Sequence, residues 1–220
     1  MRVNSSTLAD HLGAQGMLPL FYHDDVDTCV NVIRCLYEGG IRSVEFTNRG
    51  NYAKENFKSI VTYRNQYLPE LLLGVGTIRS VGDVRSFVDA GADFLISPVV
   101  DVDIAQYANE MQIPWIPGCM TPTDIHTALK YGFDLVKLFP GNLLTPAFVE
   151  SVKPLFPSVR FVVTGGVDTS RENLAAWFNA GVLTVGMGSK LLTTQVMKDP
   201  AGNGLSESVR SLLITIQSVK

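Results

Sequence analysis

The segment FVVTGGVDTSRENLAAWFNAGVLTV, residues 161–185, contains a complete strand–helix–strand unit. It opens with a short apolar run rich in β-branched side chains, which is typical of a buried strand. Thr169 and Glu172 have the spacing of a capping box and predict the start of a helix. Gly181 follows at the expected end of that helix, where glycine readily adopts left-handed backbone angles. A second apolar run, 182–185, predicts the next strand.

The same unit recurs along the whole chain. Segments with apolar residues three or four positions apart predict helices between eight short apolar runs. These runs predict strands at Leu18–Phe21, Ser43–Phe46, Leu71–Gly74, Phe94–Ser97, Trp115–Gly118, Leu135–Phe139, Phe161–Thr164 and Val182–Val185. With no linker between units, the pattern favours an α/β protein with one domain over residues 1–220, a single (β/α)8 TIM barrel. An open, doubly wound sheet is the alternative, because periodicity does not show closure.

The ends of the chain predict further helices. Residues 7–15 are expected to form an additional N-terminal helix that caps the bottom of the barrel. The polar stretch 199–204 predicts a loop, and a last amphipathic helix is expected to follow it.

Composition disfavours several classes of protein. The 220 residues are 46% hydrophobic and 18% charged, near globular averages, and the net charge is −3. We therefore expect no nucleic-acid or membrane partner, and a small molecule as the ligand. We also expect neither a signal peptide nor a membrane span, because no apolar run is long enough. The three cysteines, Cys29, Cys35 and Cys119, form no C-x-x-C pair, which favours a cytoplasmic protein.

Side chains at the carboxyl ends of barrel strands carry the chemistry of such folds. In LVKLFPG, residues 135–141, strand alternation puts Lys137 and Phe139 on one face and points the amine into the barrel. Burial disfavours a charged amine, and a neutral amine can attack a carbonyl carbon to form a Schiff base. A structural lysine is the alternative. Glu45 is the second inward candidate, either for general acid–base chemistry or for an ion pair with Lys137 or Arg49.

Other residues indicate where the two ends of a substrate would bind. Arg49 has a planar guanidinium that suits a carboxylate, although a rim arginine is more often solvated. The glycine-containing strand ends 164–168 and 186–190 predict a phosphate site, unless they serve only as tight turns. Lys190 either adds charge there or is solvated. Gly74–Thr77 lacks the spacing of a dinucleotide fingerprint, and the histidines lack metal-ligand spacing, so no cofactor and no metal are expected.

An ordered set of motifs resembles the 2-keto-3-deoxy-6-phosphogluconate (KDPG) and 4-hydroxy-2-oxoglutarate (KHG) aldolases over nearly the whole chain. The set comprises Glu45, Thr47, Arg49, Gly74–Thr77, Ser97–Pro98, Ile113–Gly118, Val136–Pro140 and Thr164–Gly166. The resemblance implies a homotrimeric class I aldolase that needs no metal. Such an enzyme cleaves a 2-keto-3-deoxy-6-phospho sugar acid or 4-hydroxy-2-oxoglutarate to pyruvate and either glyceraldehyde 3-phosphate or glyoxylate.

The resemblance also implies residue roles. Lys137 would form the imine, and Glu45 would transfer protons at the carbinolamine and at the C4 hydroxyl. The other implied contacts are Arg49 and Thr77 with the pyruvyl carboxylate, Pro98 and Phe139 around the imine, and Gly165, Gly166 and Ser189 with the distal phosphate. After the last strand the chain reads Gly-Met-Gly-Ser-Lys from residue 186, closer to phosphogalactonate-type relatives, so the sugar acid stays open.

Two other functions stay open on the residues alone. In a phosphosugar isomerase or epimerase barrel, Glu45 would abstract a proton, and Lys137 would act only electrostatically. Such an enzyme would form no covalent adduct. A non-catalytic barrel would bind a keto acid without turning it over.

Overall fold

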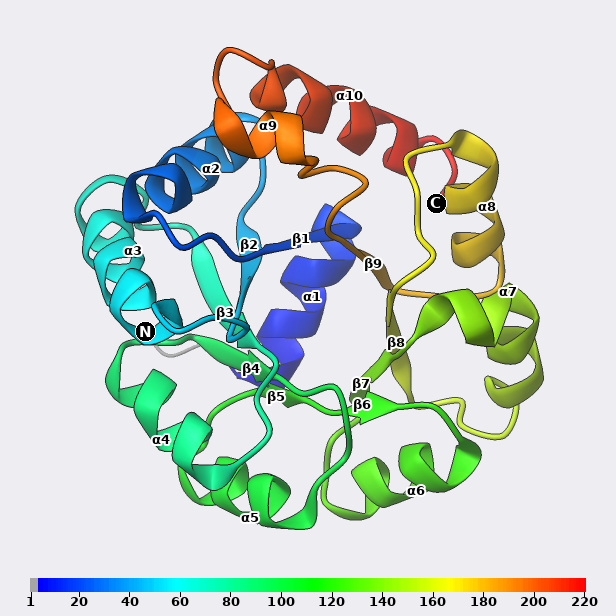
Figure 1. Cartoon of the computed structure of the whole chain (residues 1–220). Coiled ribbons are helices and arrows are strands. Elements are labelled where there is room, and N and C mark those ends of the chain that lie inside the picture. The colour runs from blue at the N-terminus through cyan, green and yellow to red at the C-terminus, as the bar shows by residue number, and fades with distance from the viewer. Residues whose placement is uncertain (1–3) are drawn as a thin grey trace.

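The computed structural model describes residues 4–220, and residues 1–3 of the predicted domain lie outside this range. In the described part of the chain, parallel strands form a barrel with helices around it (Figure 1), which confirms the predicted fold class. The strands are β1 (Met17–Phe21), β2 (Ser43–Thr47), β3 (Leu72–Gly76), β4 (Phe94–Ile96), β5 (Trp115–Ile116), β6 (Gly118–Cys119), β7 (Leu135–Leu138), β8 (Arg160–Thr164) and β9 (Thr184–Met187). The helices are α1 (Ser5–Gln15), α2 (Val26–Glu38), α3 (Ala53–Tyr67), α4 (Val81–Asp89), α5 (Val102–Glu110), α6 (Pro122–Lys130), α7 (Gly141–Val152), α8 (Arg171–Asn179), α9 (Thr194–Lys198) and α10 (Leu205–Gln217).

The fifth predicted strand is divided in two. Pro117 lies between β5 and β6, and a proline has no backbone N–H to donate to a neighbouring strand. β5 pairs with β4 and β6 pairs with β7. The Lys137 backbone nitrogen also donates to the Pro117 carbonyl oxygen at 2.8 Å. The ring therefore continues from β4 to β7, so the eight predicted strands become nine within residues 4–220, and the open-sheet alternative is wrong.

The predicted helix signals are confirmed at most positions. Gly181, which was predicted to end a helix, has φ of 95°. The glycines at the same place after α2, α4 and α6 also have positive φ: Gly40 at 109°, Gly91 at 97° and Gly132 at 88°. The predicted cap of α8 is wrong by one residue, because its N-cap is Ser170 and not Thr169. The Ser170 hydroxyl accepts the N–H of Asn173, and Asp168 in turn accepts from Ser170. The five-residue helix α9 was too short to produce a periodic pattern.

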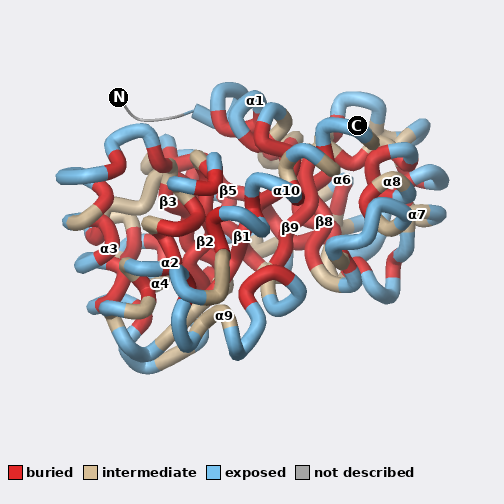
Figure 2. Tube along the Cα trace, turned by 90° about the horizontal axis from the view of Figure 1, so that it is seen from above, coloured by how far each residue is buried: buried red, intermediate tan, exposed pale blue. Residues whose placement is uncertain are grey.

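The interior of the barrel is packed solid at its N-terminal end. Leu8, Ala9 and Leu12 of α1 pack against an inner cluster of strand side chains. Its other buried members are Leu18, Phe94, Ile96, Ile116, Leu135 and Val162. Seen from above, α1 lies at one end of the barrel and α9 at the opposite end (Figure 2). The open end is therefore the carboxyl end of the strands. Within residues 4–220, no helix has both the length and the apolar character to cross a bilayer.

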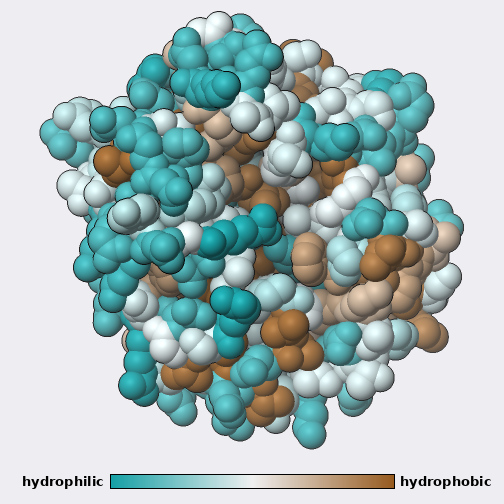
Figure 3. Space-filling view, viewed as in Figure 1, coloured by the Kyte–Doolittle hydropathy of each residue, from teal (hydrophilic) through white to brown (hydrophobic). Residues whose placement is uncertain are grey.

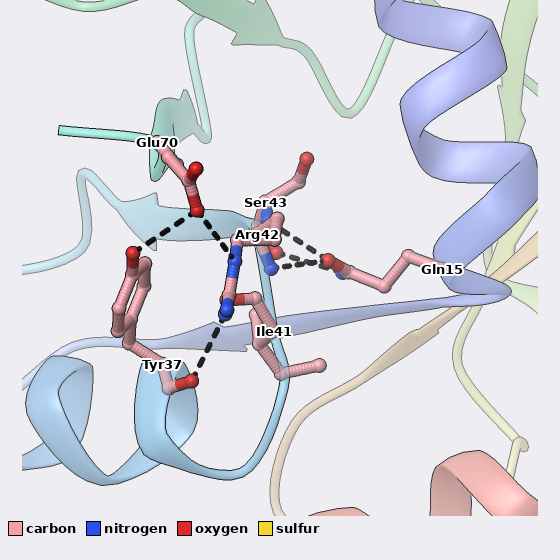
Figure 4. Close-up of polar contacts among 6 residues, drawn as sticks. All are labelled: Gln15, Tyr37, Ile41, Arg42, Ser43 and Glu70. Atoms are coloured by element: carbon pink, nitrogen blue, oxygen red, sulfur yellow. Dashed lines mark hydrogen bonds and ion pairs between the residues drawn. The ribbon is translucent and has the colours of Figure 1, made fainter. Parts of the chain in front are cut away.

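Gln15, the last residue of α1, joins this helix to β2. Its Oε1 accepts the backbone N–H groups of Arg42 and Ser43 at 2.6 and 2.9 Å (Figure 4). Its Nε2 donates to the carbonyl oxygens of Ser43, at 2.9 Å, and of Met17. Arg42 extends from the same point and pairs with Glu70 at 3.4 Å. One buried amide therefore pairs with four backbone groups where α1, β1 and β2 meet.

We expect Gln15→Leu to lower the free energy of unfolding by about 2–4 kcal/mol, because leucine leaves these buried backbone groups unpaired. Urea denaturation followed by circular dichroism measures the change. Gln217→Leu is the matched control, because the exposed Gln217 side chain makes one hydrogen bond, to the Ala14 carbonyl oxygen. An equal loss in both variants would contradict the prediction.

Candidate active site

Strands β2 and β7 bring an acid and an amine together inside the barrel. Glu45 is 1% exposed and Lys137 is 4% exposed. Oε1 of Glu45 lies 3.5 Å from Nζ of Lys137. The other carboxylate oxygen, Oε2, has no hydrogen-bond partner among the described residues. The carboxylate can therefore exchange a proton with a group at the amine and still offer one oxygen to a bound molecule.

The pair lies one layer below a cavity of about 560 Å³ at the carboxyl ends of the strands. Thr47 and Phe139 line this cavity. Each follows a member of the pair by two positions, so it faces the same side of its strand. The Phe139 ring centre lies 5.4 Å from Nζ of Lys137, where an aromatic face stabilises a cationic nitrogen. A molecule at the base of the cavity would therefore contact Phe139, which lies next to the amine.

Glycine makes room for the Glu45 carboxylate. A Cβ atom on Gly76 would lie 1.8 Å from Oε1 of Glu45, so any larger residue there would displace the acid. The next residue, Thr77, has φ of 65°, a left-handed conformation that is uncommon for a β-branched residue. Backbone outliers of this kind are concentrated at functional sites.

The far end of the cavity is built for an anion. Gly165 and Gly166 have φ of 94° and 73°. Consecutive backbone N–H groups in such turns form a concave site that attracts negative charge. Ser189 and Lys190 line the cavity from the loop after the neighbouring strand β9, and Asp168 lies beside the glycines. Hydrogen bonds from Ser170, and less strongly the charge of Lys190, lower the pKa of Asp168 from its ordinary value.

The residues predicted from sequence fall into two groups. Five of them line the cavity, namely Arg49, Phe139, Gly165, Gly166 and Ser189. Lys137, Glu45, Thr77 and Pro98 are outside that lining. Thr77 follows the glycine that lies against the Glu45 carboxylate. Pro98 lies against Gly118, the residue paired with Lys137 across β6 and β7. The second group thus surrounds the base of the cavity.

Several lining residues had no individual predicted role, and Thr164 was predicted only as part of the phosphate-site segment 164–168. Thr164 is 7% exposed, and its hydroxyl oxygen has no partner among the described residues. Its position just before the glycine pair was a usable signal. Tyr22 follows β1 in a loop, and Met197 comes from α9, so neither had a pattern that pointed to the cavity.

Other nucleophiles and ligands are less well placed than Lys137. Burial raises the pKa of the Cys29 and Cys119 thiols to about 12, so both stay protonated at neutral pH. Across residues 4–220, no group of three His, Cys, Asp or Glu side chains is arranged to hold a metal ion. The arrangement that can perform chemistry is the buried amine with its adjacent carboxylate.

Known proteins share this architecture. The KDPG and KHG aldolase family profile matches residues 9–205. The 2-dehydro-3-deoxy-phosphogluconate aldolase of Treponema pallidum is 33% identical over 172 residues, which cover 78% of this chain and 79% of that protein. The solved 4-hydroxy-2-oxoglutarate/phosphogluconate aldolase from TTHB1 is 29% identical, with a TM-score of 0.79, and the match covers 94% of this chain and 98% of that one. The KDPG aldolase of Legionella pneumophila was solved with pyruvate captured as a covalent carbinolamine. It shares the fold with a TM-score of 0.84 and 24% sequence identity, and the match covers 93% of this chain and 97% of that one.

Proposed function

This chain belongs to the KDPG and KHG aldolase family, and we propose that it is a class I aldolase whose Schiff base forms on Lys137. The substrate is a 2-keto-3-deoxy-6-phospho sugar acid, with 4-hydroxy-2-oxoglutarate as a second substrate. The observation that carries the proposal is the buried amine of Lys137, 3.5 Å from Glu45 below an open cavity.

The reaction begins at the keto carbon of the substrate. Nζ of Lys137 attacks C2, and the carbinolamine loses water to give a protonated imine. Glu45 supplies the proton that lets the hydroxyl leave as water. The imine then accepts the electron pair of the C3–C4 bond, while Glu45 takes the proton from the C4 hydroxyl. The products of this step are the free aldehyde and an enamine on Lys137.

The same two residues complete the cycle. C3 of the enamine takes up a proton, and water adds to the restored imine, which releases pyruvate and the free amine. The imine supplies the electron sink, so no metal is needed to stabilise a carbanion. The Phe139 ring, 5.4 Å from the nitrogen, favours each cationic form in this sequence.

The other residues bind the two ends of the substrate. Arg49 and Thr77 hold the pyruvyl carboxylate, and Pro98 and Phe139 form the walls around the imine. Gly165, Gly166 and Ser189 bind the distal phosphate. Support for the phosphate contacts comes from the two left-handed glycines and from the place of all three residues in the cavity lining.

The active form in this proposal is a homotrimer of single-domain chains in the cytoplasm. Exposed apolar side chains on consecutive loops support an assembly. Val99 and Val102 precede and begin α5, Met120 precedes α6, and Leu143 lies in the first turn of α7. Hydrophobic atoms are visible on this face over the lower rim of the barrel and over α7 (Figure 3). Two further copies of the chain would cover them.

Borohydride trapping tests the proposed chemistry. Incubation with pyruvate and sodium borohydride is expected to add the mass of pyruvate less one oxygen atom, and peptide mapping is expected to locate it on Lys137. A phosphosugar isomerase would give no adduct, and a non-catalytic binding protein would show no cleavage of the sugar acid. Absence of an adduct under saturating pyruvate would contradict the Schiff-base mechanism.

A further inference from the structure

The proposed mechanism leaves two charged side chains of the cavity without a role. Lys190 and Asp168 both line its distal end, together with Gly165, Gly166 and Ser189. Lys190 is exposed, and among residues 4–220 no carboxylate lies within ion-pairing distance of its ammonium. Its charge is therefore available to a molecule in the cavity.

Asp168 is held in place, whereas Lys190 is not. Oδ1 of Asp168 accepts the backbone N–H of Ser170 at 2.8 Å and the Ser170 hydroxyl at 2.6 Å. These bonds fix the carboxylate in the turn before α8 and keep it ionised. Lys190 is at the end of a four-carbon stem, so its ammonium can move toward a bound anion while the carboxylate cannot.

The charges of Lys190 and Asp168 cancel at long range, but a group bound between them interacts with each charge separately. A neutral distal group gains little from a mobile cation next to a fixed anion. For a dianion, the electrostatic energy of each contact is proportional to its charge. Because the ammonium of Lys190 can approach the dianion more closely than the carboxylate of Asp168 does, the attraction exceeds the repulsion. The buried Thr164 hydroxyl, without a partner and beside the glycine pair, also indicates a polar occupant.

We propose that Lys190 and Asp168 are two further specificity-determining residues for the distal phosphate ester of the proposed substrate, beyond the contacts of Gly165, Gly166 and Ser189. The inference rests on the proposed function, because it concerns the distal end of that substrate. Lys190 binds the ester, and Asp168 sets the strength of that contact by opposing the charge of Lys190.

Steady-state kinetics on a matched pair of substrates test the proposal. The pair is 2-keto-3-deoxy-6-phosphogluconate and unphosphorylated 2-keto-3-deoxygluconate. Lys190→Met is expected to lower kcat/KM about 30-fold on the phosphate ester, the size of a lost charge-assisted hydrogen bond, and less than about 3-fold on the unphosphorylated acid. An equal change on both substrates, or no change on the ester, would overturn the assignment of Lys190.

A double-mutant cycle tests the contribution of Asp168. Asp168→Asn keeps an oxygen acceptor for Ser170 but removes the charge, so kcat/KM on the ester is expected to rise about 3-fold. In the Lys190→Met background, the same change is expected to recover part of the loss, because the carboxylate no longer repels the ester. A decrease in either background would overturn the role of Asp168.

Two further measurements separate this inference from the proposed function. Lys198→Met removes the same charge from α9, at a residue outside the cavity lining, and is expected to change neither substrate's kcat/KM more than about 2-fold. Calorimetric binding of inorganic phosphate depends on no catalytic step, and Lys190→Met is expected to weaken it about 10-fold. If the wild-type chain forms no pyruvate adduct yet phosphate binding weakens as expected, the aldolase proposal fails and the charge selection stands. Unchanged phosphate affinity in Lys190→Met overturns the inference.

Discussion

Replacement of Lys137 by arginine is expected to lower kcat/KM for aldol cleavage by at least about 10⁴-fold, the usual cost of removing a covalent nucleophile. Arginine keeps a positive charge next to Glu45, but its guanidinium stays protonated and cannot attack a carbonyl carbon. The loss should therefore appear as the absence of a borohydride-trapped adduct together with the absence of cleavage. A coupled assay of pyruvate release measures the residual rate.

The choice of arginine separates chemistry from stability. Lys137→Ala would leave the Glu45 carboxylate buried without its partner, which costs about 3–5 kcal/mol of folding free energy. Inactivity of an alanine variant could then reflect unfolding. Lys137→Arg, compared with the wild type by urea denaturation and by phosphate binding, avoids this ambiguity. A folded arginine variant that still gives an adduct would show that another lysine carries the imine.

Two regularities in the sequence predict most of the arrangement of Glu45, Lys137 and Phe139 in the barrel. Strand alternation has a period of two, so an inward Phe139 fixes an inward Lys137 once the strand is recognised. Parallel strands in a barrel place their carboxyl ends on one face, which brings Glu45 and Lys137 to the same end. The positive-φ glycines at the ends of helices likewise follow from local steric limits on the backbone.

The features that were missed depend on contacts between distant segments. The division of the fifth strand follows from Pro117, but its effect on pairing depends on both neighbours, β4 and β7. The shift of the α8 cap to Ser170 depends on hydrogen bonds with Asp168. Met197 reaches the cavity from a five-residue helix whose position is set by packing and not by its own periodicity.

Glu45→Gln is expected to lower kcat about 10²- to 10⁴-fold, since glutamine has nearly the same shape but cannot accept or release a proton at neutral pH. The variant should still form a trapped adduct with pyruvate, more slowly, because Lys137 keeps its nucleophilic nitrogen. The defect should therefore lie mainly in turnover, with a smaller change in KM. Rapid-quench measurement of adduct formation beside steady-state cleavage separates the two steps.

Gly76→Ala tests whether the position of the Glu45 carboxylate matters, because this variant keeps the charge of Glu45. The new methyl group would lie 1.8 Å from Oε1 of Glu45, so the carboxylate must move away from Lys137 while keeping its charge. If proton transfer depends on the 3.5 Å contact, this variant should lose kcat to an extent similar to that of Glu45→Gln. Glu150→Gln, on the exposed surface of α7, is the charge-matched control. Wild-type turnover in both Glu45→Gln and Gly76→Ala would mean that another group moves the proton. Lys137 would then react without proton transfer by Glu45, although the two side chains are buried together.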